Sequence, residues 1–211
     1  MSQSCLTNPS VTIVADTSAV INLNASGSAV AVLQALPNRV VLTDTVLSEL
    51  SVDKRTGRND AKLIRSIIDA ELIAITALAS LKEDHFAGLV AGPAAETLGD
   101  GEAATVACAV ETNGVAIIDD RKAVALCARK YRSLLVASTV DVFAHDAIGI
   151  ALGRAKLADA VYAALQTARM RVPSRHEKWV VDLIGEARAK SCLSLRSRLR
   201  ARRTDATRVG A

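Results

Sequence analysis

Aromatic side chains are nearly absent from this chain, which holds one Trp, two Tyr and two Phe among 211 residues. Half of the residues are hydrophobic, so the core must be built almost entirely from Ala, Val, Leu and Ile. A chain of this length can bury such a core in one domain, with or without an appendage. The composition therefore favours packed layers of helices and strands.

Long apolar runs and a secretory leader are also missing. The apolar runs fall far short of the roughly 18 residues that a membrane helix needs, and the polar start "MSQSCLTNPS" does not resemble a signal peptide. The four cysteines form no C-x-x-C pair, and Cys108 and Cys127 are predicted to be core thiols. His85, His145 and His176 show no metal-ligand spacing and are predicted to be surface residues. We therefore expect a cytoplasmic protein with no membrane contact.

Positive charge is concentrated at one end of the chain. Residues 188–211 hold eight basic residues and one acid, a net +7, whereas the rest holds 18 basic and 21 acidic residues, a net −3. A basic tail attracts polyanions, and it is equally typical of a disordered end. We expect a helical extension over 151–190, packed on the preceding domain or on a partner, followed by this basic tail over 191–211.

Short β-rich runs alternate with helical patterns along the first 150 residues. The predicted strands cover 11–16, 39–44, 72–77, 115–119 and 134–139. The predicted helices cover 18–36, a stretch from 46, 61–70, part of 79–99, 100–114 with Asp100 as N-cap, and a stretch to about 130. This alternation predicts an α/β fold, a three-layer α/β/α sandwich around a mainly parallel sheet.

Beyond about residue 150 the pattern is purely helical. Two amphipathic helices are predicted, with Pro173 between them. Their apolar faces are marked by Leu157, Val161 and Leu165 in the first helix and by Trp179, Leu183 and Ala187 in the second.

Acidic residues stand at corresponding places in several of these units. Asp16 ends the first predicted strand, and the pair Asp119 and Asp120 ends the fourth. Glu49 lies about one helical turn beyond the second strand, and Glu102 lies in the first turn of the helix that leads into the fourth. The carboxyl ends of parallel strands share one edge of a sheet, so these acids are expected to meet at that edge.

Clustered carboxylates without basic partners repel one another, which raises their pKa values and costs stability. A divalent cation removes this conflict, and an all-oxygen ligand set suits Mg²⁺ or Mn²⁺. Such an ion can polarise a phosphoryl oxygen and lower the pKa of a bound water, which then attacks phosphorus in line. The acids therefore predict a metal site with phosphoryl chemistry.

Each acid also has a purely structural explanation. Asp16 could cap the helix that follows it, Glu49 could be a solvated helix residue, and Glu102 could complement the dipole of its helix. The pair Asp119 and Asp120 is harder to explain in this way, because one cap needs one Asp. The set as a whole is more informative than any of its members.

Four segments, in order, resemble the acidic motifs of PIN-domain proteins: "VADTSAVINL", "VVLTDTVLSEL", "LGDGEAATVACA" and "VAIIDDRKAVALCARK". In particular they resemble the bacterial and archaeal branch related to the VapC toxins, whose third motif reads G-E-A and whose fourth ends in D-D-R. The resemblance covers about residues 11–145. It implies a Mg²⁺- or Mn²⁺-dependent ribonuclease fold, often the toxin of a toxin–antitoxin pair and often a homodimer.

The resemblance also implies roles for the acids. By match to the motifs, Asp16, Glu49 and Glu102 correspond to the first three acids of the family. The fourth falls on Asp119 or Asp120, and Asp120 is in better register. We therefore expect Asp16, Glu49, Glu102 and Asp120 to be catalytic, and all five acids to be candidate metal ligands.

Four further residues are candidates for contacts with the substrate. Thr17 or Ser18 matches the small hydroxyl residue that follows the first acid in the family and helps to orient it. Arg121 and Lys122 follow the acid pair and could guide phosphate into the site. Since few aromatic rings are present to stack on bases, recognition of RNA would rest on phosphate contacts and RNA shape.

The sequence thus predicts a metal-dependent endoribonuclease domain over 1–150, with an RNA substrate, a possible antitoxin partner and a homodimeric state. The alternative is a non-catalytic PIN-like module that binds RNA or a protein through its helical, basic C-terminus. A phospho-acceptor receiver domain is disfavoured, because its acid pair should follow the first strand and a Lys should follow the last. A dinucleotide-binding enzyme is disfavoured because no G-x-G-x-x-G follows the first strand.

Overall fold

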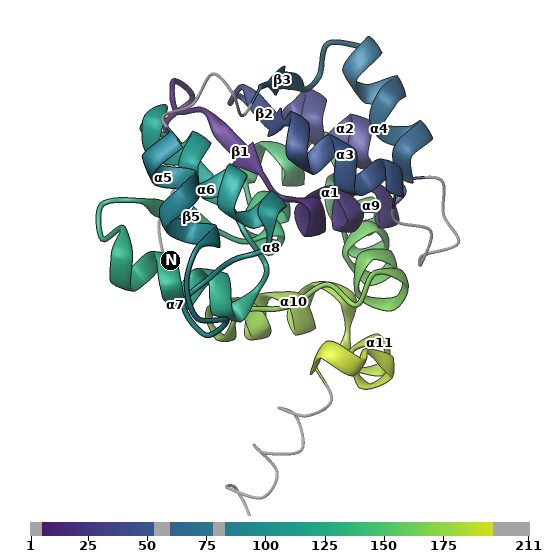
Figure 1. Cartoon of the computed structure of the whole chain (residues 1–211). Coiled ribbons are helices and arrows are strands. Elements are labelled where there is room, and N and C mark those ends of the chain that lie inside the picture. The colour runs from purple at the N-terminus through teal and green to yellow at the C-terminus, as the bar shows by residue number, and fades with distance from the viewer. Residues whose placement is uncertain (1–5, 53–59, 78–82, 196–211) are drawn as a thin grey trace, which may run out of the picture.

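The computed structural model describes residues 6–52, 60–77 and 83–195 (Figure 1). The strands are β1 (Ile13–Ala15), β2 (Val40–Thr43), β3 (Ala74–Thr76), β4 (Val115–Ile117) and β5 (Leu135–Ala137). The helices of the first half are α1 (Thr17–Ala25), α2 (Ala29–Ala35), α3 (Asp44–Val52), α4 (Asp60–Asp69) and α5 (Glu83–Val90). Those of the second half are α6 (Asp100–Glu111), α7 (Arg121–Lys130), α8 (Thr139–Phe143), α9 (Asp146–Thr167), the 3₁₀ turn η2 (Ser174–His176), α10 (Glu177–Ile184) and α11 (Glu186–Ser191).

The strands form one sheet in the order β3-β2-β1-β4-β5, and every strand pair in the described part of the chain is parallel. The central strand is β1, where Val14 lies between Val41 of β2 and Ala116 of β4. The predicted parallel α/β sandwich is therefore confirmed. Because β1 is central, the residue that follows it lies in the middle of the carboxyl edge of the sheet.

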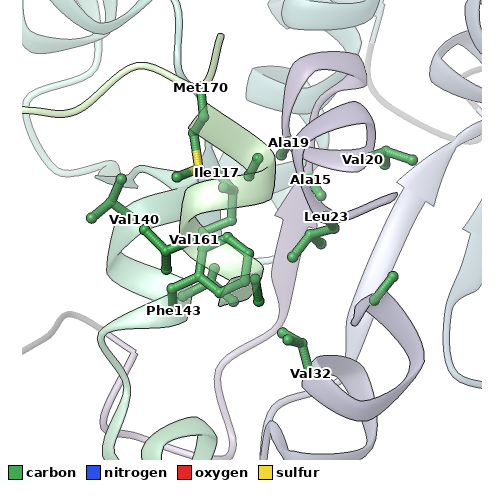
Figure 2. Packing of buried hydrophobic residues seen from close by; sticks show 14 of the residues in the cluster. Ala15, Ala19, Val20, Leu23, Val32, Ile117, Val140, Phe143, Val161 and Met170 are labelled. Carbon is green, nitrogen blue, oxygen red and sulfur yellow. The ribbon is translucent and has the colours of Figure 1, made fainter. Parts of the chain in front are cut away.

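Alternate residues of the short strands enter two separate cores, one on each face of the sheet. Ile13 and Ala15 of β1 belong to a cluster with residues of α1, α2, α4 and α9, part of which is drawn in Figure 2. Val14 belongs to the opposite cluster, with residues of α5, α6 and α7. Since successive side chains of a strand point to opposite faces, even a three-residue strand can join both layers.

The helices after residue 145 pack on the first of these faces. Helix α9 contacts α1, α2 and α8, and α10 contacts α9. Figure 1 shows α10 and α11 at the end of the molecule away from α2 and α4. Gly153, at φ 69°, interrupts the helical geometry of α9, a backbone conformation that glycine adopts without strain.

Leu157, Val161 and Leu165 are buried, which confirms the predicted face of the first C-terminal helix. The face predicted for the next helix is confirmed in part, because Trp179 and Leu183 are half-buried and pack against the core. The prediction is wrong for Ala187, which is exposed in a separate helix. Gly185, at φ 82°, ends α10, so the expected periodicity stops before Ala187.

The predicted helix over 18–36 is in fact two helices. The chain turns at residues 26–28, where Gly27 has φ 67° and the Ser26 hydroxyl donates a hydrogen bond of 2.5 Å to the Leu23 carbonyl. Asp100 is also not the predicted N-cap. It is the first residue of α6, and Gly99 is the cap, with its amide 3.4 Å from the Glu102 carboxylate that accepts from it.

Cys108 and Cys127 are free, buried thiols, as predicted, and burial raises the pKa of Cys127 to about 11. Cys5 and the basic residues from Arg196 onward lie outside the described residues. Among the helices that the structure describes, none combines the length and the apolar character needed to cross a bilayer.

Candidate functional site

Asp16 occupies the centre of the carboxyl edge, directly after β1. Its side chain caps α1 by accepting a 2.6 Å hydrogen bond from the Ala19 amide. Asp16 therefore has the helix-capping role that the sequence suggested as a structural explanation. The Ser18 hydroxyl lies 2.9 and 2.8 Å from its two carboxylate oxygens. Only 2 % of Asp16 is exposed. Burial, followed by the nearby charge of Asp119, raises the pKa of Asp16 to about 8.

Asp119 follows β4 and points inward. Its carboxylate accepts hydrogen bonds from the Thr139 amide at 3.0 Å, from the Thr139 hydroxyl, and from the Asn22 amide at 2.7 Å. These bonds join the end of β4 to α8 and α1. Burial raises the pKa of Asp119 above its usual value. The hydrogen bonds and the positive charge of Arg171 act in the opposite direction but do not outweigh burial.

Asp120 differs from its buried neighbour Asp119 in its exposure to solvent. It is exposed, and its side chain caps α7 by accepting a 2.8 Å hydrogen bond from the Ala123 amide. Glu102, in the first turn of α6, is half-buried. Burial and then the charge of Asp120 raise the pKa of Glu102, while Lys122 acts in the opposite direction.

Glu49 is held by two neighbouring elements. Its carboxylate accepts a 2.8 Å hydrogen bond from the Gly101 amide at the start of α6 and another from the Thr17 hydroxyl. A Cβ atom on Gly101 would lie within 2.8 Å of this carboxylate, so a larger residue there would displace the Glu49 side chain. Thr17 therefore orients Glu49, whereas Ser18 orients the first acid, Asp16.

The structure joins all five predicted acids in one electrostatic network. The charges of Asp119 and Glu102 raise the pKa of Asp16, and those of Asp120 and Glu49 raise the pKa of Glu102. Within the described residues, no Lys or Arg side chain forms an ion pair with any of the five. Burial and mutual repulsion thus raise the pKa values of Asp16 and Glu102. The charge of Lys122 near Glu102 offsets this effect only in part.

The donor set is chemically suited to a hard divalent cation, since it consists of carboxylates with hydroxyl side chains beside them. No group of three or more His, Cys, Asp or Glu side chains in the described ranges is arranged to hold a metal ion on its own. Mg²⁺ usually keeps several waters and takes only one or two carboxylates directly, so a site for this ion does not need three protein ligands.

Three residues that contact Asp119 could not be recognised as part of the site from the sequence. Asn22 and Thr139 bind Asp119 from 97 and 20 residues away along the chain. Arg171 donates a 3.1 Å hydrogen bond from Nη1 to the Asp119 carbonyl oxygen. Such contacts depend on the tertiary fold. The two predicted phosphate contacts, Arg121 and Lys122, are exposed at the start of α7.

A second buried carboxylate, Asp141 in α8, lies in a different environment. Ser138 caps α8 and donates a 2.6 Å hydrogen bond to it. Arg175 and His176 form contacts of 2.5 and 2.6 Å with its two oxygens. His176 is therefore not the unpaired surface residue that the sequence suggested. Burial acts to raise the pKa of Asp141, but the hydrogen bonds from His176, Ser138 and Arg175 hold that pKa well below its usual range.

A parallel α/β/α sandwich with an acidic carboxyl edge defines the class of the protein. The family model described as a PIN domain matches residues 12–186, which is most of the chain. This chain belongs to the PIN-domain family. PIN domains are generally nucleases, so the family indicates a nuclease-type hydrolase. No curated protein and no solved structure matches the chain.

Proposed function

We propose that this protein is a Mg²⁺- or Mn²⁺-dependent endoribonuclease that hydrolyses phosphodiester bonds at the acidic edge of its sheet. The observation that carries the proposal is the network of five acids, of which the most buried, Asp16, has its pKa raised to about 8. A site of this kind favours either a proton or a cation. In a PIN-domain protein, binding of a divalent cation would give these acids a role in phosphodiester hydrolysis.

The residues divide by what they do around such an ion. Asp16, with Glu102 and one of the pair Asp119 and Asp120, would hold the cation, and Glu49 would extend the negative charge beside it. When bound, the ion would supply Lewis-acid stabilisation of the phosphoryl oxygens and a water of lowered pKa. Because burial excludes solvent around Asp16 and Asp119, their attraction for a cation is stronger than it would be in water.

The hydroxyl groups of the site hold the acids in place. Ser18 fixes the Asp16 carboxylate through both of its oxygens, and the Thr17 hydroxyl fixes Glu49. A carboxylate held in this way loses less freedom when a ligand binds, which is the usual advantage of a preorganised site. Arg121 and Lys122, exposed beside the acid pair, are proposed to attract the RNA backbone.

The proposal is tested by cleavage of RNA with Mg²⁺ or Mn²⁺ and with a chelator. The wild-type protein is compared with the Asp16→Asn and Asp120→Asn variants, which keep the shape of each side chain and remove its charge. Metal-dependent cleavage that both substitutions abolish would support the assignment. Variants that cut RNA as fast as the wild type would show that the acids do not form the catalytic site.

The non-catalytic alternative makes a different prediction. If the protein only binds RNA or a partner through its C-terminus, substitution of the acids changes little, and neutralising the basic tail abolishes binding. Deletion from residue 188 is unsuitable for this test, because Ala189, Cys192 and Leu195 are buried in the core. Replacing Arg196, Arg200 and Arg203 by Gln leaves those core contacts in place.

The resemblance to the VapC branch extends the proposal to a toxin with a protein antitoxin and to a homodimer. Induced expression in a bacterial host should then arrest growth, and the Asp16→Asn protein should not. Sedimentation of the purified protein measures its oligomeric state. Growth unaffected by the wild-type protein, with its nuclease activity verified in the same cells, would argue against the toxin role.

A further inference from the structure

The Asp119 side chain is held from both sides by the helices that begin next to β4. The strands β1 and β5 both pair with β4, so α1 and α8, which follow them, start on either side of Asp119. Asn22 of α1 donates a 2.7 Å hydrogen bond from Nδ2 to Asp119 Oδ2. Thr139, the first residue of α8, donates its hydroxyl to the same oxygen and its amide, at 3.0 Å, to Oδ1. Three donors therefore fix both oxygens of this carboxylate.

Both donor residues are polar side chains buried where an apolar one would pack. Asn22 is 4 % exposed and lies in α1 with Ala19 and Leu23, which belong to the core, and Thr139 is fully buried. A buried amide or hydroxyl without a hydrogen-bond partner costs stability, whereas Leu or Val of similar size carries no such cost. The bonds to Asp119 compensate for this burial, so the two residues are best explained by what they do to that acid.

The three bonds leave the Asp119 carboxylate with one free acceptor site. A carboxylate offers about four lone-pair sites, two on each oxygen. Oδ2 accepts from the Asn22 amide and the Thr139 hydroxyl, so both of its sites are used. Oδ1 accepts from the Thr139 amide, and no second donor from the described part of the chain reaches it. Oδ1 is thus the oxygen that can bind one further ligand.

The backbone places this oxygen close to the middle of the acidic edge. Ile117 pairs with Ala15 of β1, and the Asp16 amide donates a 3.2 Å hydrogen bond to the Ile117 carbonyl. Asp16 and Asp119 therefore follow the ends of two adjacent strands at one edge of the sheet. The sheet sets the position of Asp119 relative to Asp16, and Asn22 and Thr139 set the orientation of its carboxylate.

We propose that Asn22 and Thr139 are positioning residues of the nuclease site, which hold Asp119 so that it offers a divalent cation one oxygen, Oδ1. The inference rests on the proposed ribonuclease function and adds two residues to it. Neither residue needs to touch the ion or the RNA, because both act through Asp119. A ligand that is already oriented loses little freedom on binding, so removal of these donors should lower the affinity for the ion.

Two substitutions remove the side-chain donors with little change in size. Asn22→Leu removes the amide and Thr139→Val removes the hydroxyl, whereas Thr139→Ser keeps the hydroxyl. Asn24→Leu and Thr112→Val are the matched controls. Asn24, in the same helix as Asn22, donates a 3.2 Å hydrogen bond to the Asp60 carboxylate, and the Thr112 hydroxyl donates to a main-chain carbonyl of α6. Each control loses a hydrogen bond that involves none of the five acids.

Binding of Mn²⁺ to the metal-free protein, followed by the electron paramagnetic resonance of free Mn²⁺, is the main measurement. RNA cleavage at a series of Mg²⁺ concentrations is measured in parallel. We expect Asn22→Leu and Thr139→Val each to weaken Mn²⁺ binding about tenfold or more, and to raise the Mg²⁺ concentration for half-maximal cleavage similarly. The KM for RNA at saturating Mg²⁺ should not change. Thr139→Ser and both controls should bind Mn²⁺ within about threefold of the wild type.

A double-substitution cycle tests whether the two residues act through Asp119. Asp119→Asn should itself weaken Mn²⁺ binding, because it removes a charged oxygen ligand. Adding Asn22→Leu or Thr139→Val to Asp119→Asn should weaken binding no further, since the group that these donors orient is already changed. Thermal melting without metal measures the stability of each protein separately.

Wild-type Mn²⁺ affinity in Asn22→Leu or in Thr139→Val, beside a wild type that binds Mn²⁺ and cleaves RNA, would overturn the inference for that residue and leave the proposed function standing. This holds even if the melting temperature of the variant is lower, because the residue would then be purely structural. Equal weakening with and without Asp119→Asn would also overturn the inference. If the wild type neither binds Mn²⁺ nor cleaves RNA, the proposed function fails, and the inference fails with it.

Discussion

Two buried aspartates in this protein, Asp16 and Asp141, have opposite electrostatic environments. Asp16 caps α1 and Asp141 lies in the first turn of α8, and both accept a hydrogen bond from a serine hydroxyl. Asp141 also contacts Arg175 and His176, and its pKa lies well below the usual range. For Asp16, burial and the charge of Asp119 raise the pKa to about 8.

The difference shows that burial alone does not define the role of a carboxylate. A buried charge with cationic partners stabilises a fold only as long as both partners stay, and removal of one is costly. A buried carboxylate surrounded by other acids destabilises the fold in its charged form, and such sites are typical of function. Asp141 is therefore a structural residue that ties α8 to η2, and Asp16 is the residue to which a cation is proposed to bind.

The largest effect is expected from replacing the Asp16 carboxyl group. The Asp16→Asn protein should lose about 10³-fold or more in the rate of RNA cleavage, because several kcal/mol of metal-dependent stabilisation are removed. The melting temperature of its metal-free form at neutral pH should stay the same or rise, because buried Asp16 must take up a proton on folding and Asn is neutral without one. Initial cleavage rates and thermal melting measure both effects. A loss of activity below about tenfold would contradict the account.

The corresponding change at the other site should have the opposite profile. Asp141→Asn leaves Arg175 and His176 without their carboxylate, and we expect a loss of about 3 kcal/mol in the free energy of unfolding. The cleavage rate of the folded protein should stay within about threefold of the wild type, because no acid of the edge is changed.

Urea unfolding measures this loss of stability. Lys178→Gln is the control, since Lys178 pairs with Asp182 on the surface and is 83 % exposed. That substitution should cost less than about 0.5 kcal/mol. An Asp141→Asn protein as stable as the control would show that the buried pair contributes nothing to the fold.

The two sites also make the stability depend on pH in opposite ways. The pKa of Asp16 is raised from 3.8 to about 8 by folding, so between these values the folded protein holds a proton that the unfolded chain has released. The contribution of Asp16 to stability is therefore full below pH 3.8 and is lost as the pH rises towards about 8. The pKa of Asp141 is lowered, so its contribution is present above the usual aspartate range and is lost in acid.

For the metal-free protein, we expect the free energy of unfolding to fall by about 2 kcal/mol or more between pH 5 and pH 8. Asp16→Asn should flatten this part of the curve, and saturating Mg²⁺ should raise its alkaline end, because the ion replaces the proton. Denaturant unfolding at a series of pH values gives the curves. Parallel curves for the wild type and Asp16→Asn would mean that Asp16 does not titrate in this range.

The smallest expected effect comes from the hydroxyl that orients Asp16. Ser18→Ala removes the hydroxyl that helps to lower the pKa of Asp16, so a proton should compete better with a cation. The Mg²⁺ concentration for half-maximal cleavage at neutral pH should rise about fivefold, equivalent to roughly 1 kcal/mol. Ser133→Ala, at an exposed position, is the control. An unchanged Mg²⁺ requirement would show that Ser18 only supports the helix cap.

Much of this arrangement could be predicted from the sequence, because local rules determine it. Short β-rich runs alternating with helical patterns give a parallel sheet, and in a parallel sheet Asp16 and the pair Asp119 and Asp120 must share an edge. The turn at Gly27 also has a local signal, the Ser26-Gly27-Ser28 sequence, but the apolar helical pattern on both sides of it favoured one continuous helix. The family motifs placed Glu49 and Glu102, whose electrostatic coupling the structure gives.

What could not be predicted depends on contacts between distant segments. Adjacent residues Asp119 and Asp120 look equivalent in sequence, yet one is buried by Asn22 and Thr139 and the other is an exposed cap. The position of Arg171 depends on how α9 packs on α1 and α2, which no local pattern encodes. In each case the deciding partner lies far away along the chain.

The central claim is that the acidic edge binds a divalent cation in exchange for a proton. Titration of Mn²⁺ into the metal-free protein, with free Mn²⁺ followed by its electron paramagnetic resonance signal and the released protons by a pH indicator, tests this directly. We predict saturable binding near neutral pH with release of a proton, weakened at least about tenfold in Asp16→Asn and unchanged in Lys178→Gln. Absence of saturable binding at millimolar Mn²⁺, or equal binding by Asp16→Asn, would contradict the account.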